Sequence, residues 1–262
     1  MTSAVTAILA NADFFVLLLF RVSGLIFASP VFGRTILPAR VKIGLIAAIA
    51  FLFFTIFPPT VIEYSTLFGF VLIAAEELLM GIALAFVTNI FFALTFIGGQ
   101  LIDMQIGFGI ANVYDPQNNT QIPMIGNVLN TVLLLVFFGV DGHLRLIEIV
   151  YVTINRLPIG ALTFSPAIGL AALEVFSMTF VLGVMVAMPI IASGLVLEIV
   201  FGMLARTVPQ IHMFVVGVPV KLLVGFVALI FTMPVFIRFS ERIFSEMFIA
   251  IEKMFSAFLA GA

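Results

Sequence analysis

The run Leu78–Ile97 holds twenty residues without a charged side chain. A helix of that length is about 30 Å long, which matches the hydrocarbon thickness of a lipid bilayer. Such runs recur along the chain, which is 63% hydrophobic and 9% charged, whereas soluble domains are about 25% charged. A bilayer admits only structures that satisfy their own backbone hydrogen bonds. The sequence therefore predicts an all-α integral membrane protein with about six apolar helical segments.

Proline residues interrupt these apolar segments. Pro30 and Pro58 close the first two, whereas Pro189 and Pro234 lie inside later ones. A proline inside a helix removes one backbone hydrogen bond and clashes with the preceding turn, so we expect several broken or kinked helices. The first residues lack the basic stretch of a cleavable signal peptide, and we expect the first apolar segment to be retained.

Charged residues within or beside the apolar segments form a second constraint, because lipid makes a buried charge costly. The five that we single out are Arg21, Glu76, Glu77, Glu198 and Lys221. Arg21 either lies near a membrane interface or faces inward in an ion pair within an assembly. The adjacent Glu76 and Glu77 either precede a helix that begins at about Leu78 or face protein. We expect these side chains to be buried or to lie between subunits.

The longest polar interruption is Gly98–Ile125, which is rich in amides, carboxylates and glycines. It is either an ordinary aqueous loop or an irregular segment inside a channel, since non-helical backbone at membrane depth must be buried or line water. If the helix continues past Gly99, residues at helical spacing form a polar stripe on one face. The members of this stripe are Gln100, Asp103 and Met104, followed by Gly107.

A second short polar segment lies between two very apolar arms near the C-terminal end. It contains Arg206, Pro209 and Gln210. Two apolar helices joined by a short polar link are typical of a helical hairpin, and these residues would form its tip.

These pieces together resemble the FliR family, the export-gate subunit that flagella share with the T subunit of virulence type III secretion systems. Each motif is weak alone, but their order and spacing are specific. The matching stretches are Arg21 with Pro30–Gly33, Pro38–Lys42, Gly99–Gly109, Tyr114–Pro116, Gly142–His143, Ala205–Phe214 and Gly217–Lys221. His212 stands where the family usually has another polar residue, a small departure.

The resemblance implies a helical export gate in the bacterial inner membrane, within the flagellar basal body. One copy of such a protein assembles with several P-type and Q-type subunits and contacts the switch protein, and unfolded protein substrates pass through. It also implies a single membrane domain over 1–262, with a P-like part at about 1–165 and a Q-like hairpin and C-terminal helix at about 166–262. No fusion to the switch protein is expected after Ala262.

The resemblance further implies that a loop at about 106–122 plugs the closed pore. Phe108 between two glycines suits a deformable seal, since an apolar constriction blocks ions by dewetting. The residues that we assign to this plug are Gly107, Phe108, Gly109, Ile110, Asp115, Pro116 and Gln117.

Two rival functions remain open. A secondary transporter also has broken helices and intramembrane carboxylates, but no internal repeat is present and the carboxylates are scattered. The second rival function is that of a structural scaffold for assembly, in which the plug is passive. No paired acid and base, nucleophile motif or metal-ligand spacing points to an enzyme, so we expect no catalytic residue, metal or cofactor. The chain has no basic patch, so we do not expect it to bind nucleic acid. We expect it to contact membrane lipid.

Overall fold

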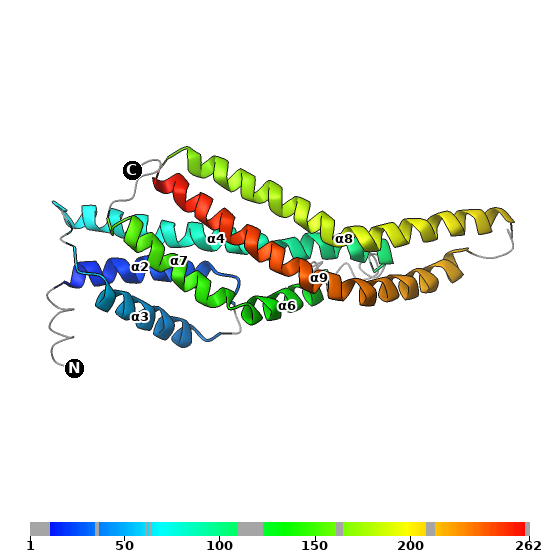
Figure 1. The fold of residues 1–262 in the computed structure, drawn as a ribbon, viewed down its shortest axis with the longest axis horizontal. Helices are drawn as coiled ribbons and strands as arrows, with labels where there is room; N and C mark the ends of the chain where they lie inside the picture. The colour runs from blue at the N-terminus through cyan, green and yellow to red at the C-terminus, as the bar shows by residue number, and fades with distance from the viewer. Residues whose placement is uncertain are drawn as a thin grey trace. The chain divides into compact units, whose positions relative to one another are not determined.

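The computed structural model describes residues 11–34, 37–60, 62, 64–108, 123–160, 165–207 and 213–259, and of residues 213–215 only the backbone. These residues form seven helices and no strand. Figure 1 labels these helices and colours them in chain order. The helices are α2 (Ala12–Ala28), α3 (Ala39–Ile56), α4 (Leu67–Ile106), α6 (Met124–Gly139), α7 (Gly142–Arg156), α8 (Ala167–Thr207) and α9 (Met213–Leu259). The predicted all-α membrane class is confirmed.

Four helices in the described part of the chain are long and apolar enough to cross a membrane. They are α3, α4, α8 and α9, the last over Val216–Leu259. The pair α6 and α7 meets the same criterion only together, with a bend of 66° between them. α2 has 17 residues and is therefore about 25 Å long, which is short of a bilayer core of about 30 Å. The six apolar segments thus correspond to four or five candidate spans.

The prolines inside the apolar segments do not end the helices. α8 runs for 41 residues through Pro189, and α9 runs for 47 residues through Pro219 and Pro234. Each proline removes one hydrogen bond from the ladder, while the bonds on either side continue. The apolar segments that contain Pro189 and Pro234 are therefore parts of longer helices.

The chain folds into two compact units, and α4, α8 and α9 contribute to both. The first unit comprises Met1–Phe91, Asp141–Val175 and Glu246–Ala262. The second comprises Phe92–Val140 and Phe176–Ser245. The predicted division into residues 1–165 and 166–262 rests on family resemblance and stays a prediction.

The first unit is built on close packing among α2, α3 and the beginning of α4. Phe14 of α2 meets Phe54 of α3 with 6.3 Å between ring centroids. α2 crosses α4 where Gly24 faces Gly81, and a Cβ atom on either glycine would overlap the backbone of the other helix. Tyr64, which lies between α3 and α4, donates a hydrogen bond from its hydroxyl to Asp13 in the first turn of α2 over 2.8 Å. That bond raises the pKa of the Tyr64 phenol.

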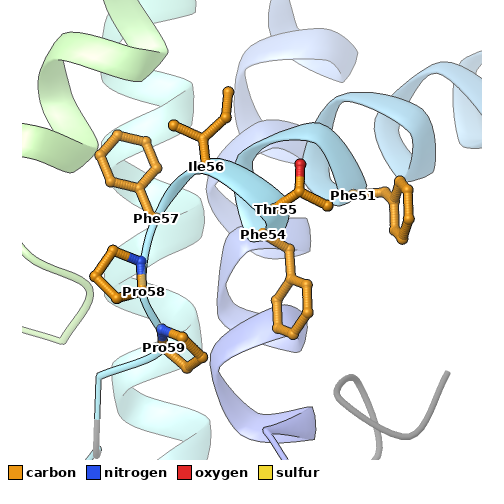
Figure 2. Close-up of a pocket in the computed structure, with 7 residues that line it drawn as sticks. All are labelled: Phe51, Phe54, Thr55, Ile56, Phe57, Pro58 and Pro59. Carbon is orange, nitrogen blue, oxygen red and sulfur yellow. The ribbon is translucent and has the colours of Figure 1, made fainter. Parts of the chain in front are cut away.

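An open hollow of about 500 Å³ lies at the C-terminal end of α3, where the two prolines end the helix (Figure 2). Its lining is Phe51, Phe54, Thr55, Ile56, Phe57, Pro58 and Pro59. The only polar side chain among them is Thr55, whose hydroxyl already donates to the Leu52 carbonyl over 2.7 Å. The hollow therefore offers no group for acid–base chemistry.

The second unit has an aromatic core shared by three helices. Phe92 of α4, Phe137 of α6 and Phe244 of α9 lie with their ring centroids 5.3–6.2 Å apart. Beside them, the buried Asn130 amide donates to the Thr95 hydroxyl over 3.2 Å. These contacts fix the end of α4 that carries the predicted polar stripe.

Candidate functional site

The polar stripe belongs to a continuous helix, because α4 extends past Gly99 to Ile106. Gln100 and Met104 are exposed, whereas Asp103 is 7% exposed and buried. The stripe is therefore not a single solvent-exposed face of the helix. The helix ends at Gly107, whose φ of +101° lies in the left-handed region that glycine adopts without strain.

Asp103 connects the end of α4 to the beginning of α6. Its Oδ1 accepts a hydrogen bond from the Ile125 backbone N–H over 3.2 Å. The residue at the helix start is Pro123, which makes no side-chain capping bond of its own. A carboxylate at a helix N-terminus satisfies an unpaired N–H and interacts favourably with the helix dipole. Asp103 thus acts as a cap supplied by another helix.

A direct backbone contact lies next to this cap. Gly99 of α4 faces Gly126 of α6 so closely that a Cβ atom on Gly99 would overlap the Gly126 backbone. Together with Asp103, this contact holds the end of α4 against the beginning of α6. We call this pair of contacts the stem.

Phe108 lies immediately after α4, and its side chain packs on α9. Its ring meets Phe226 edge to face, with 5.7 Å between centroids. Ile106 packs where Gly225 leaves space, since a Cβ atom there would lie 2.6 Å from its Cγ1. The apolar residue that the sequence singled out between two glycines is therefore in contact with α9.

A polar cluster joins α4, α8 and α9 beside Phe108. Glu198 Oε1 accepts from Lys221 Nζ over 2.6 Å and from Gln105 Nε2 over 3.4 Å. Gln105 also lies against Gly194, where a Cβ atom would be 2.7 Å from its Cγ. Glu198 and Lys221, predicted to be buried or between subunits, pair with each other within the chain.

The remaining predicted charges lie in the first unit, and two of them form one buried ion pair. Arg21 Nε and Glu77 Oε2 are 2.5 Å apart, and both side chains are fully buried. Arg21 also donates to the Leu157 carbonyl over 3.1 Å, and Glu77 accepts from the Gly160 N–H over 2.8 Å. Arg21 therefore faces inward and pairs within the chain itself. Glu76 is only half-buried.

Several predicted site residues lie outside the described part of the chain. Those of the plug are Gly109, Ile110, Asp115, Pro116 and Gln117, and those of the hairpin tip are Pro209 and Gln210. Arg206 is described and is exposed near the end of α8. Among the described residues, no group of three His, Asp or Glu side chains could hold a metal ion.

Capping by Asp103 can be tested by removing its acceptor. Asp103→Ala should destabilise the fold by about 1–2 kcal/mol, because loss of an N-cap acceptor leaves a helix N–H without its partner. Asp103→Asn keeps an acceptor and should cost less. Thermal unfolding in detergent measures both changes, and equal effects of the two variants would contradict the capping role.

Comparison with known proteins places these residues in a family. The family model described as bacterial export proteins, family 1, matches residues 12–247. The chain is 34% identical to the flagellar biosynthetic protein FliR of Escherichia coli K12 over 230 residues, which cover 88% of each protein. It is 33% identical to FliR of Bacillus subtilis, covering 88% of this chain and 90% of that protein. FliR of Aquifex aeolicus is 26% identical over 91% of this chain and 92% of its own length.

Proposed function

The chain belongs to the bacterial export proteins of family 1, and from this premise we propose that it is a subunit of the flagellar protein export apparatus in the bacterial inner membrane. Its relatives in Escherichia coli and Bacillus subtilis carry the name flagellar biosynthetic protein FliR. The long apolar helices supply four or five candidate spans for a membrane location. The role is one of transport and does not include a chemical step.

We further propose that segment 106–122 is the plug of an export pore. The observation that carries this proposal is the seating of Phe108, an apolar side chain at the root of the segment, on Phe226 of the hairpin. Gly107 gives the backbone a flexible turn directly before it. The stem holds the end of α4 against the beginning of α6, on either side of the segment. An apolar side chain in a narrow passage stops ions by excluding water.

The partners that fit this function are P-type and Q-type gate subunits and the switch protein, with unfolded polypeptide as substrate. The hairpin formed by α8 and α9 supports a multi-subunit setting. It carries large apolar side chains that are more than half exposed within the chain, among them Val196, Ile199, Ile230 and Phe231. Apolar surface of this extent is covered by lipid or by other subunits.

Coexpression tests the assembly. The tagged chain is produced together with the small membrane proteins of the same operon, and the purified material is weighed by native mass spectrometry. We expect one copy of this chain with several copies of two partners. A uniform monomer or homodimer whose stability responds to a small ligand would instead favour a secondary transporter.

The plug is tested at Phe108 with a matched pair of substitutions. Phe108→Ser should raise resting ion leakage of the assembled gate severalfold, because a hydroxyl wets the constriction. Phe108→Leu keeps the side chain apolar and should stay close to wild type. Replacing residues 107–121 by a glycine-serine linker should leak at least as much as Phe108→Ser. Unchanged leakage in the linker variant would refute the plug. Conductance is measured in vesicles that contain the complete complex.

A further inference from the structure

Pro189 divides the part of α8 in the second unit into two portions that contact α4 differently. Before the proline, Gly183 lies against α4 so closely that its Cβ would be 3.1 Å from the Leu94 carbonyl oxygen and 3.2 Å from the Ile97 Cβ. After the proline, α8 reaches α4 through Gly194 and Glu198, which meet the side chain of Gln105. In the first contact the Gly183 backbone meets the Leu94 carbonyl and the Ile97 side chain, whereas the second contact depends on the long side chain of Gln105.

The two prolines near this level weaken both arms of the hairpin. Pro189 has no N–H, so the Met185 carbonyl loses its bond in the helix ladder, and Pro234 has the same effect in α9. A cavity of about 120 Å³ lies beside them, and its lining includes Met185, Pro189, Met233 and Val235. Missing hydrogen bonds and free volume at one level are the features of a hinge.

The contact beyond the hinge is one that can break. The ion pair of Glu198 and Lys221 joins α8 to α9 inside the hairpin, so it does not have to break. Gln105 of α4 reaches this pair through one long hydrogen bond of 3.4 Å to Glu198 Oε1. The stem, in contrast, rests on the buried Asp103 and on glycine backbones in contact. Separation should therefore occur between the hairpin and α4, while the stem stays in place.

We propose that the portion of the hairpin beyond Pro189 and Pro234 is a hinged arm that a clasp holds against the end of α4. The clasp consists of Gln105 with Gly194 and Glu198, together with Phe108 with Phe226. Opening the clasp removes the seat of Phe108 on Phe226. This inference rests on the proposed function and names the movement that regulates the plug.

A reversible disulfide can lock the clasp. The chain contains no cysteine, so engineered thiols have no native competitor. A Cβ on residue 194 would lie 2.7 Å from Gln105 Cγ, which puts the two Cβ atoms within about 4.2 Å, inside the range that a disulfide needs. In the complete gate, Gln105→Cys/Gly194→Cys should export a reporter fused to a flagellar substrate at least tenfold more slowly when oxidised than after reduction.

A second cysteine pair on the other side of the hinge is the matched control. In Ile97→Cys/Gly183→Cys the Cβ atoms would lie 3.2 Å apart, close to disulfide geometry. This contact should not move, so oxidation should leave the export rate within twofold of the reduced rate. Alkylation of the remaining thiols measures how much of each disulfide has formed.

The outcomes separate the clasp from the proposed function. If the wild-type chain does not support export in a strain that lacks it, the proposed function fails. If the wild type exports and the oxidised 105–194 pair exports as fast as its reduced form, only the clasp is wrong. The clasp would also be overturned if the 97–183 disulfide formed and the 105–194 disulfide did not under the same conditions. Residues 105 and 194 would then not be in contact. Equal inhibition by both disulfides would contradict a hinge at Pro189.

Discussion

Replacement of Arg21 by leucine should destabilise the first unit by about 3–5 kcal/mol, because it leaves a buried carboxylate without its counter-ion. Arg21 and Glu77 are both fully buried, and their shortest contact is 2.5 Å. Each also binds the link between α7 and α8, through the Leu157 carbonyl and the Gly160 N–H. The substitution therefore removes a charge partner and also frees a backbone group. Thermal unfolding in detergent should show a large fall in the midpoint, together with lower yield of assembled complex.

A double replacement shows whether the charge or the packing is responsible. Arg21→Leu/Glu77→Leu removes both charges, so it should be less destabilised than either single variant, since no orphan ion remains. Glu76→Gln is the control, because it alters the neighbouring, half-buried carboxyl and should change stability by less than about 0.5 kcal/mol. If the single variants lost no more stability than this control, a buried ion pair would be contradicted. The same would follow if the double variant lost as much stability as the two single variants added together.

This ion pair also illustrates what the sequence could predict. Hydrophobic run length gave the helical membrane class, and the cost of charge in lipid marked Arg21 and Glu77 as residues that need partners. Neither argument could pair them, because they are 56 residues apart in the chain and hydropathy contains no distance information. Pro189 and Pro234 lie inside α8 and α9 without ending them, because each proline removes only one hydrogen bond from a long helix.

The candidate site was predictable in part. The polarity of Gly98–Ile125 identified the region, and the glycines around Phe108 identified its root. Helical periodicity placed Gln100, Asp103 and Met104 on one face, yet Asp103 is buried as a cap. A cap supplied from another helix leaves no signal in local spacing. The role of Gly194 is equally hidden, since it depends on where Gln105 lies in space.

The second large effect is expected at the stem, where Gly99→Ala should destabilise the second unit by about 3 kcal/mol. Overpacking usually costs about 1–3 kcal/mol, because neighbouring side chains can shift. At Gly99 the obstacle is the Gly126 backbone itself, which the new Cβ would overlap, so relief requires α4 and α6 to move apart. Such a movement would also lengthen the bond from Ile125 to Asp103, and both stem contacts would be lost together.

Two further alanine substitutions calibrate this prediction with the same chemical change. At Gly126 a Cβ would meet its nearest neighbours at 3.0–3.2 Å, so Gly126→Ala should have a smaller effect than Gly99→Ala. At Gly202 of α8 nothing lies within 4 Å, and alanine should stabilise the helix by up to about 1 kcal/mol. The expected order of unfolding midpoints is therefore Gly202→Ala, Gly126→Ala and Gly99→Ala, from highest to lowest. Resistance of the assembled complex to limited proteolysis between α4 and α6 should follow the same order, because the stem holds these two helices together. A Gly99→Ala variant that unfolds and resists protease like Gly202→Ala would show that α4 and α6 are not in backbone contact.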